Sequence, residues 1–360
     1  MSATLSVGIV NPSWTPFRHN TDHVCVMDLA NLGRHVDNLH MAFIGSQLQQ
    51  TWSNVSIATH RVWPTARLPR LVLRPQPNKV QALYQYGQDI KGLRVAASGA
   101  LPMMCTVGFP SLRHVIARGP DFLEASALAI EHQAGNCARI HFHTDAMREL
   151  YLERRPNDAQ RSITVPFFLP QLAFIDEAEM HAKFEREDIT LLFVGADGQR
   201  KGLEELCMAL DSIAQGLNYH QVTAVIVSKH PPSCQIFRGV KHLARVSRNE
   251  VQTLMRKAQM YCMVPRHESF GIVFVEAMAA GCAVIADDDL PRQEIFEGGR
   301  CGVLLSARQP DALAAAILKL LQDRSAAKAL ALQGLRRARE RYAPVRVAGL
   351  YAQAFREMTA

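Results

Sequence analysis

The chain has 360 residues, 48% of them hydrophobic, and its 40 Lys and Arg against 33 Asp and Glu give a formal net charge of +7. At this length two hydrophobic cores are expected rather than one. The eight cysteines are scattered without a Cys-x-x-Cys pair, which argues against both a disulfide framework and a zinc site. No apolar run approaches the ~20 residues that span a bilayer, and the first residues lack the features of a signal peptide, so we expect a cytoplasmic protein.

The positive charge is concentrated in the N-terminal part of the chain. Residues 38–88 contain no Asp or Glu, while basic and aromatic side chains are interleaved through them. These side chains are Arg61, Arg67, Arg70, Arg74, Lys79, Trp52, Trp63, Tyr84 and Tyr86. The stretch is either a solvated basic face or a surface that docks on an anionic membrane leaflet, where each cation contributes about 1 kcal/mol. We expect no nucleic-acid partner, because no recognised binding module accompanies the charge.

The order of apolar and helix-periodic segments predicts the fold class. Apolar runs with β-branched residues alternate with helix-periodic stretches, which is the pattern of β-α-β units and parallel sheets. In the first half, strands are expected at residues 5–10, 93–96, 103–107, 139–143 and 163–167, and helices at 121–134 and 145–154. In the second half, strands are expected at 190–194, 223–227, 260–264, 283–286 and 303–305, and helices at 203–213, 249–258 and 272–280. After Pro310 the chain should be helical, with a break at Pro344.

The segment 166–188 divides the two series. It contains Pro166, Pro170 and the charged run DEAEMHAKFERED, and it begins where the first series ends. We therefore place the domain junction there and expect two doubly wound domains, 1–170 and 186–340, followed by a last helix over 341–360. Ligands of such sheets bind beyond the carboxyl ends of the strands, where the informative motifs also fall.

A turn rich in glycine and cations follows the strand expected at 190–194. It reads Gly195-Ala-Asp-Gly-Gln-Arg200-Lys201-Gly202 and leads into a helix. Gly195 lets the backbone approach a ligand closely, the start of the helix offers free N–H groups, and the two cations can neutralise a diphosphate. The turn contains neither a Walker A loop nor a G-x-G-x-x-G pattern. On this motif alone, an ordinary turn with solvated cations is the alternative.

A second turn carries two glutamates eight positions apart. The segment HESFGIVFVEAMAAGCAVIA, residues 267–286, has Glu268 before a Ser-Phe-Gly turn and Glu276 on the apolar helix that follows. The turn residues lie where backbone donors are unpaired, and both carboxylates can accept hydrogen bonds from hydroxyls of one extended ligand. The alternatives are structural: Glu276 as a buried salt-bridge partner, with Arg292 as one candidate, and Glu268 as a helix N-cap.

Together these motifs resemble the C-terminal domain of retaining nucleotide-sugar glycosyltransferases of family 4, which have the GT-B fold. The resemblance rests on Glu268-x7-Glu276, on the continuation AMAAGCAVIA, and on the segments LPRQEIFEGG at 290–299 and FVGADGQRKGLEEL at 193–206. The motifs follow one another in the family's order and spacing. The resemblance implies an α/β protein with two Rossmann-like, doubly wound parallel-sheet domains facing across a cleft. The N-terminal domain would bind the acceptor, the second domain would bind the donor, and the C-terminal helix would pack back on the N-terminal domain.

The resemblance also implies catalytic roles for three charged residues. Arg200 and Lys201 would hold the donor diphosphate and stabilise the charge that grows on it as the glycosidic bond breaks, so that no metal is needed. Glu268 would lie beside the transferred sugar. Because retention in this family is assigned to attack on the same face as the leaving group, Glu268 is not expected to be a covalent nucleophile.

The remaining donor contacts are expected mostly from the main chain. The amides of Phe270, Gly271 and Ile272 would face phosphate and sugar, and Val246 is a candidate for backbone contact with the base. With the carboxylate of Glu276 on the ribose hydroxyls, the expected donor-binding set is Gly195, Val246, Ser269, Phe270, Gly271, Ile272 and Glu276. No cofactor is expected, because the nucleotide sugar is a substrate.

The N-terminal half departs from the family pattern in two places. Where family members often carry a Gly-Gly loop after the first strand, this chain reads NPSWTPFRH over residues 11–19. Where many members have a histidine near the sugar, this chain has Gly108. Four nearby histidines are candidates to replace it, although a lone histidine is more often structural: His114, His132, His141 and His143.

The sequence therefore predicts a retaining glycosyltransferase that moves a sugar from a nucleotide-sugar donor to a glycan or glycolipid acceptor, such as lipopolysaccharide or capsule. A UDP-sugar is the preferred donor, with GDP- and ADP-sugars as alternatives. An anionic inner-membrane surface is a candidate partner, which would place the protein peripherally on the cytoplasmic face of that membrane. Two other functions stay open: a nucleotide-sugar epimerase or isomerase of the same fold, and a sugar-nucleotide-binding partner subunit without turnover.

Overall fold

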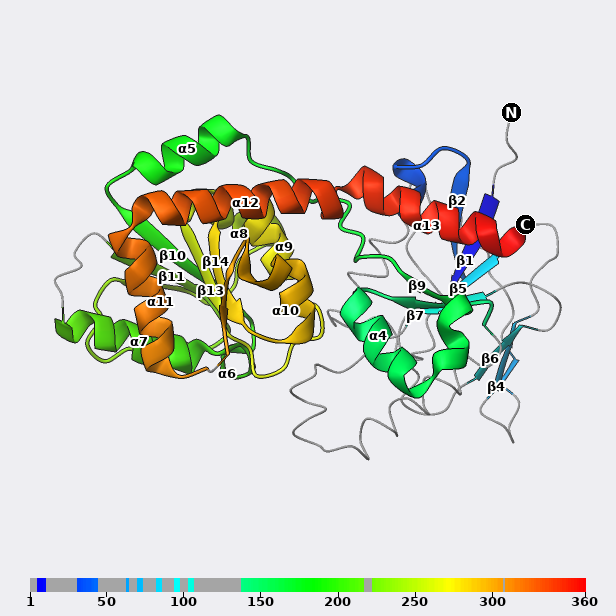
Figure 1. Ribbon diagram of the computed structural model, residues 1–360, viewed down its shortest axis with the longest axis horizontal. Helices are drawn as coiled ribbons and strands as arrows, with labels where there is room; N and C mark the ends of the chain where they lie inside the picture. Colours follow the sequence, from blue (N-terminus) through cyan, green and yellow to red (C-terminus); the bar gives the residue numbers. More distant parts are fainter. Residues whose placement is uncertain are drawn as a thin grey trace. The chain divides into compact units, whose positions relative to one another are not determined.

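The structure, a computed structural model, describes residues 5–10, 31–44, 63–64, 70–73, 82–85, 94–97, 103–106, 137–216, 222–306 and 308–360. These residues form two compact units (Figure 1). The first unit combines the described residues up to Gln171 with Tyr342–Ala360, and the second unit runs from Leu172 to Arg341. The division falls inside the segment 166–188, and the second unit begins earlier than the residue 186 expected from the sequence.

The first unit contains a six-stranded sheet in which all neighbouring strands are parallel, in the order β2-β1-β5-β7-β8-β9. Its strands are β1 (Leu5–Val10), β2 (Leu39–Ile44), β5 (Ala82–Gln85), β7 (Met103–Thr106), β8 (Arg139–Phe142) and β9 (Ser162–Thr164). A smaller sheet consists of β3 (Trp63–Pro64), β4 (Arg70–Leu73) and β6 (Arg94–Ala97). The described helices are α4 (Asp145–Arg154), α13 (Pro344–Thr359) and the 3-10 helices η1 (Asn31–Arg34) and η2 (Pro156–Arg161).

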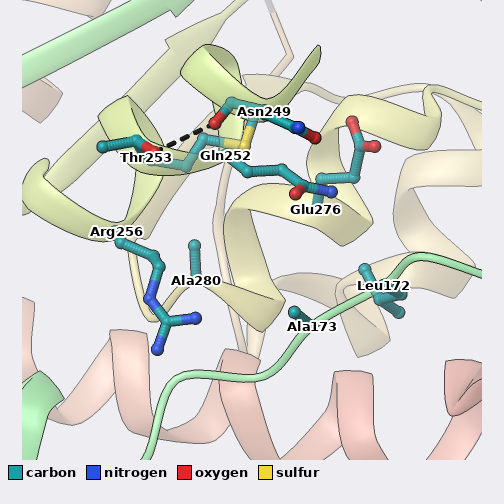
Figure 2. A pocket seen from close by; sticks show the side chains of 9 residues that line it. Leu172, Ala173, Asn249, Gln252, Thr253, Arg256, Glu276 and Ala280 are labelled. Atoms are coloured by element: carbon teal, nitrogen blue, oxygen red, sulfur yellow. Dashed lines mark hydrogen bonds between the residues drawn. The ribbon is translucent and has the colours of Figure 1, made fainter.

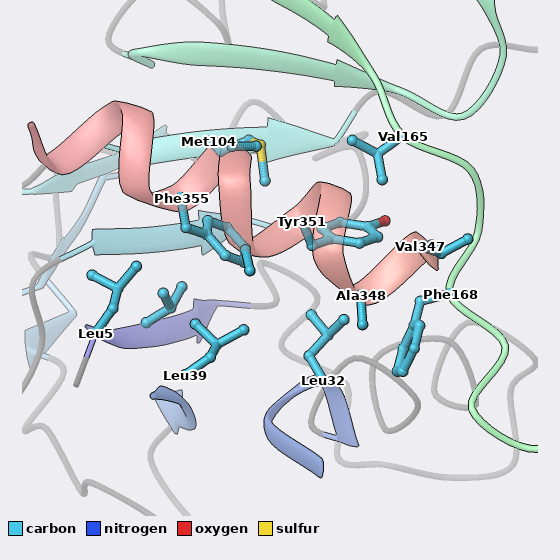
Figure 3. Close-up of a cluster of buried hydrophobic side chains, with 13 residues drawn as sticks. Leu5, Leu32, Leu39, Met104, Val165, Phe168, Val347, Ala348, Tyr351 and Phe355 are labelled. Carbon is cyan, nitrogen blue, oxygen red and sulfur yellow. The ribbon is translucent and has the colours of Figure 1, made fainter. Parts of the chain in front are cut away.

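The C-terminal helix α13 is part of the core of the first unit (Figure 3). Pro344 begins the helix, at a position where a missing N–H leaves no intrahelical bond unmade. Val347, Tyr351 and Phe355 follow at a spacing of four residues, so they lie on one side of the helix. They share a buried cluster with residues of β1, β2, β7 and the segment after β9, namely Leu5, Val7, Leu39, Met104, Val165 and Phe168. The prediction that the last helix packs on the N-terminal domain is confirmed.

The second unit contains a six-stranded parallel sheet in the order β12-β11-β10-β13-β14-β15. Its strands are β10 (Ile189–Val194), β11 (Val222–Val227), β12 (Val240–Leu243), β13 (Met260–Met263), β14 (Ala283–Asp287) and β15 (Val303–Leu305). Counted from β10, this is the 3-2-1-4-5-6 order of the doubly wound dinucleotide-binding fold. The chain reverses its direction of winding between β10 and β13, so a ligand is expected beyond the carboxyl ends of these two strands.

Helices cover both faces of this sheet. Figure 1 shows α7 and α11 on one side and α8, α9 and α10 on the other. The helices are α5 (Glu177–Glu185), α6 (Gly198–Lys201), α7 (Leu203–Gly216), α8 (Arg248–Lys257), α9 (Ile272–Ala279), α10 (Leu290–Ile295), α11 (Pro310–Gln322), α12 (Arg324–Tyr342) and the 3-10 helix η3 (Glu297–Gly299). Because both faces are covered, β13 and β14 are buried at every residue, which explains why β13 and the first four residues of β14 are apolar.

The charged segment before β10, where the sequence places the domain junction, belongs to the second unit. It forms α5, which Asp176 caps by accepting a hydrogen bond from the amide of Glu179 at 2.6 Å. Met180, Lys183 and Phe184 share its buried side at helical spacing. The buried ammonium of Lys183 donates to the carbonyl of Ala280 at 2.8 Å, which ties α5 to the end of α9. The helix expected at residues 121–134 lies outside the described residues.

Candidate active site

Two loops meet at the switch point of the second sheet. β10 and β13 are neighbours, with Leu191 opposite Met260 and Leu192 opposite Tyr261. Residues 195–202 follow β10 and residues 265–271 follow β13, so both loops leave the sheet at the same edge. These are the two segments that the sequence singles out.

Glycines bring the first loop close to its neighbours. A Cβ at Gly195 would lie 2.9 Å from the Cβ of Lys201, and one at Gly202 would lie 2.4 Å from the main-chain oxygen of Val264. Gly202 also has φ +83°, a conformation that side chains disfavour. The short helix α6 between these glycines is capped by Asp197, which accepts a hydrogen bond from the amide of Arg200 at 3.2 Å. The loop therefore presents Arg200 and Lys201 from a turn that the glycines allow to pack closely.

Main-chain contacts join the two loops. The amide of Arg266 donates to the carbonyl of Arg200 at 2.8 Å. In return, Nη1 of Arg200 donates to the carbonyl of His267 at 2.8 Å. The cations of the first loop are thus held against the residues around Glu268.

The carboxylate of Glu268 lies between the two cations. It forms an ion pair with Nζ of Lys201, and Nη1 of Arg200 lies 3.9 Å from its Oε2. The side chains of Lys201 and Glu268 are 15% and 14% exposed, whereas that of Arg200 is 43% exposed. Lys201 and Glu268 therefore form a partly desolvated pair, and Arg200 extends toward solvent. The structural alternative for Glu268 is wrong, because Gly271 is the N-cap of α9.

Gly271 begins α9 in a conformation that only glycine adopts easily. Its φ is +87°, and a Cβ there would lie 2.5 Å from the ring of Phe274. The cap provides no side-chain hydrogen bond, and the amide of Phe274 donates to the carbonyl of Gly271 at 2.9 Å. The amide of Ile272, at the very start of the helix, is a donor that an anion or hydroxyl can use. Phe270 is buried at 3% exposure and anchors the turn, while Ser269 is exposed. These residues lie where a donor phosphate or sugar could reach them.

The second glutamate lies on the exposed side of an otherwise buried helix. Oε1 of Glu276 is 3.4 Å from Nη2 of Arg248, the first residue of α8. Arg292, the partner suggested in the structural alternative, instead binds Asp287 and Asp289. Glu276 thus forms a partly buried ion pair, with Arg248 in place of Arg292. Val246 is partly buried in the loop before α8, two residues from Arg248, which places it on the Glu276 side of the site.

Glu276 also lines a cavity of about 250 Å³ between α8 and α9 (Figure 2). The other lining residues come from α8, from α9 and from the segment before α5, and they are Leu172, Ala173, Asn249, Gln252, Thr253, Met255, Arg256 and Ala280. Ligand pockets commonly measure ~300 to 1,000 Å³, so this cavity can hold only part of a nucleotide sugar.

Two of the candidate histidines lie in the first unit, where His141 is buried and His143 is partly buried. His141 is fully buried, with Nδ1 at 3.0 Å from Oγ1 of Thr106 and Nε2 at 2.7 Å from the carbonyl of Val165. Burial lowers the pKa of His141 to about 4, and burial beside His141 lowers the pKa of His143 well below its usual value. Both rings are therefore neutral at pH 7. The other two histidines, Gly108 and the loop at 11–19 lie outside the described residues, as does most of the basic stretch at 38–88.

The sequence does not indicate that two arginines contact the site residues: Arg248 pairs with Glu276, and Arg292 binds the main chain of Glu268. Arg292 is fully buried, and its Nη1 donates to the main-chain carbonyl of Glu268 at 2.8 Å.

Among the described residues, no group of three or more His, Cys, Asp or Glu could hold a metal ion. None of the described helices is long and apolar enough to cross a membrane.

Comparison with known proteins identifies the second unit. Residues 176–337 match the family model described as glycosyl transferases group 1. This part of the chain is similar to that family. The phosphatidyl-myo-inositol mannosyltransferase of Mycolicibacterium smegmatis is 31% identical over 189 residues, which are 50% of this chain and 47% of that protein. A GDP-mannose-dependent alpha-(1-6)-phosphatidylinositol monomannoside mannosyltransferase of Mycobacterium tuberculosis is 29% identical over 149 residues, 38% of this chain and 39% of that protein. The chain thus spans about half the length, or less, of the curated relatives it matches.

The likeness in fold extends over the whole chain, including the first unit. The sucrose-phosphate synthase of Thermosynechococcus elongatus superposes with a TM-score of 0.71 at 16% identity, covering 98% of this chain and 99% of that one. The chain has the GT-B fold, as the sequence predicts. The family match covers the second unit, which is the unit that carries Arg200, Lys201 and Glu268.

Proposed function

We propose that this protein transfers a sugar, with retention of configuration, from a nucleoside-diphosphate sugar to a glycan or glycolipid. The observation that carries the proposal is the cluster of Arg200, Lys201 and Glu268 at the switch point of a group 1 glycosyl transferase unit. Two cations beside a helix N-terminus suit a diphosphate, and a carboxylate next to them suits the hydroxyls of the attached sugar.

In the proposed reaction, the bond between the sugar C1 and the β-phosphate oxygen breaks while the acceptor oxygen attacks on the same face. Negative charge then grows on the diphosphate, where Arg200 and Lys201 stabilise it. The acceptor proton passes to the leaving phosphate. Glu268 orients the sugar, the amides at the start of α9 bind phosphate or sugar, and Glu276 binds the ribose. Because the two cations supply the stabilising charge, we propose that turnover continues in EDTA.

Different observations support the choice of the donor's nucleotide and the choice of the acceptor. The sequence favours a UDP-sugar, whereas the name of one relative, at 29% identity, includes GDP-mannose. Both nucleotides offer the same ribose and diphosphate to the cluster, so UDP- and GDP-sugars are the donors to compare. The names of the relatives also include phosphatidylinositol, a lipid, which supports a glycolipid acceptor.

The experiment is slow hydrolysis of a panel of UDP-, GDP- and ADP-sugars, followed by transfer to added glycolipids. If Lys201 faces the leaving group, Lys201→Ala should raise the activation free energy by about 2 to 4 kcal/mol. Turnover should then fall roughly 30- to 1,000-fold. Lys328→Ala is a matched control, because Lys328 also pairs with a glutamate, Glu185, at 3.7 Å in the same unit. An unchanged rate in Lys201→Ala, or no release from any donor, contradicts the proposal. An α-linked product from an α-linked donor tests retention, and interconverted donor without transfer indicates an isomerase.

We further propose that the protein works at the cytoplasmic face of the inner membrane, because a basic and aromatic stretch at 38–88 accompanies a proposed lipid acceptor. Anionic vesicles should sediment the protein at low salt, and 0.5 M salt should release it, because screening shortens the range of surface charges. Neutral vesicles serve as the control. A protein that stays in the supernatant with anionic vesicles at low salt contradicts membrane docking.

A further inference from the structure

We propose that Arg292 is a positioning residue that holds the main chain of Glu268 in place for sugar transfer. The proposal rests on the function proposed above, since it gives Arg292 an effect on donor turnover. Arg292 lies in α10, just beyond the carboxyl end of β14, and it is 0% exposed. A charge buried this completely is stable only when its donors are paired.

The contacts of Arg292 connect three elements. Its Nε and Nη2 donate to the two carboxylate oxygens of Asp287 at 3.0 and 2.9 Å. Nη2 also donates to Asp289 at 2.9 Å, and Nη1 donates to the carbonyl oxygen of Glu268 at 2.8 Å. Asp287 ends β14, and Asp289 is the N-cap of α10. Because the guanidinium is planar, two buried aspartates fix its orientation and thereby aim Nη1 at the loop after β13.

Arg292 differs from the other side chains that hold this loop. Arg200 binds the carbonyl of His267, and Lys201 binds the carboxylate of Glu268. In the proposed reaction both cations turn toward the diphosphate and weaken their hold on the loop. Arg292 cannot follow them, because it is buried and held by two aspartates. It therefore keeps the main chain of Glu268 fixed while the carboxylate exchanges Lys201 for the sugar.

The test is a double-mutant cycle between Arg292 and Glu268. An ammonium cannot reproduce the fork that spans two aspartates and a carbonyl, so Arg292→Lys should lower kcat about 10- to 100-fold, as expected for a misplacement near 1 Å. The KM for donor and the Kd for UDP or GDP should stay within about 3-fold, because Arg200 and Lys201 are intact. In the Glu268→Gln background, Arg292→Lys should change kcat by less than about 2-fold. Losses that multiply in the double variant, or a rise in KM in place of the fall in kcat, overturn the proposal.

Arg337→Lys provides a matched control. Arg337 also binds a carboxylate, that of Glu297 at 2.9 Å, and a main-chain carbonyl, that of Glu294 at 3.3 Å. Its side chain is 18% exposed and lies on α12. This variant should keep kcat within about 2-fold of the parent, so a general effect of losing a buried arginine is separated from an effect on Glu268.

Hydrogen exchange gives a readout that does not need activity. In Arg292→Lys, amides of residues 266–270 should exchange faster, while those of β13 stay protected. Unchanged exchange in that loop overturns the positioning role. If the parent protein turns over no nucleotide sugar, the proposed function fails, and the exchange result still decides what Arg292 does. Asp289→Asn, which retains a good N-cap and removes one charge from around Arg292, gives the same comparison if Arg292→Lys does not fold.

Discussion

At the scale of single residues, the protein without donor already has its two diphosphate-binding candidates engaged. Lys201 pairs with Glu268, and Arg200 binds the carbonyl of His267 while lying 3.9 Å from the same carboxylate. A carboxylate in this position holds the cations in place and also repels an incoming diphosphate. Glu268 is therefore expected to oppose nucleotide binding while it supports turnover.

Glu268→Gln should separate these two effects. Removing the charge from a partly exposed pair corresponds to about 1 kcal/mol, so UDP or GDP should bind about 3- to 10-fold more tightly. Turnover of the matching nucleotide sugar should fall by about 100-fold, because the sugar loses a charged hydrogen-bond acceptor. Calorimetric titration and donor hydrolysis measure the two quantities. Glu185→Gln, the partner of Lys328, is the control, and weaker nucleotide binding in Glu268→Gln would refute the prediction.

Gly271→Ala should harm both stability and turnover. Its φ of +87° costs a non-glycine residue about 1 to 2 kcal/mol, and the new methyl would lie 2.5 Å from the ring of Phe274, with overpacking of about 1 to 3 kcal/mol. Since the shift occurs at the start of α9, donor turnover should also fall.

Gly298→Ala is the comparison for this variant. Gly298 has φ +65°, but the nearest atom to an added Cβ is 3.7 Å away, so only the backbone cost of about 1 to 2 kcal/mol applies. Gly271→Ala should be less stable than Gly298→Ala in thermal unfolding, and it should hydrolyse the donor more slowly. Equal stability of the two variants would show that the Phe274 ring moves aside without cost.

Residue types in the two turns could be predicted from sequence, but some partners could not. Glycines beside cations after a strand indicate an anion site whatever the long-range contacts are. The choice between Glu276, Asp287 and Asp289 as partners of Arg292 depends on how β14 and α10 pack, which no local pattern encodes. The structural alternative that the sequence offers, an ion pair of Glu276 with Arg292, therefore names the wrong partner.

At the scale of elements, the same contrast holds. β10, β13 and β14 are predictable because burial on both faces requires an unbroken apolar run. β12 has no residue that is fully buried, since it is an edge strand, and its sequence VKHL gives no such signal. The sequence gives no clear sign of the helix α5, because its buried residues are few and one of them is Lys183.

The packing of α13 should affect the stability of the first unit and not that of the second. Phe355 is fully buried against that unit's core, so Phe355→Ala should destabilise it by about 3 to 5 kcal/mol, and Phe355→Leu by less than about 1.5 kcal/mol. Hydrogen exchange resolved by segment should show β1, β7 and β8 losing protection while β10 and β13 keep theirs. A loss shared equally by both units would contradict the assignment of α13 to the first unit.

At the scale of the whole molecule, acid should act on the first unit in part through the buried His141. The pKa of His141 is about 4 in the folded protein and about 6.5 when unfolded, so its contribution is complete above pH 6.5. As the pH falls from 6.5 toward 4, only the unfolded chain takes up the proton, and stability drops by about 1.4 kcal/mol per pH unit. The unfolding free energy of the first unit should therefore be about 2 kcal/mol lower at pH 5 than at pH 7. His141→Gln should make the unfolding free energy of the first unit less dependent on pH. An unfolding free energy of the parent that is the same at pH 7 and pH 5 would contradict the prediction.

The C-terminal helix α13 belongs to the core of the first unit, and this affects the order in which the two units fold during synthesis. The described core of the second unit lies within one continuous stretch, Leu172–Arg341, whereas the first unit needs α13 in addition to its sheet. Domains fold as they leave the ribosome, and a core cannot close before its last element has been made. The sheet that is made first must therefore remain incomplete, with Leu5, Leu39 and Met104 uncovered, while the second unit is made and folds before it. A chaperone that shields nascent apolar strands should matter most for this earlier half.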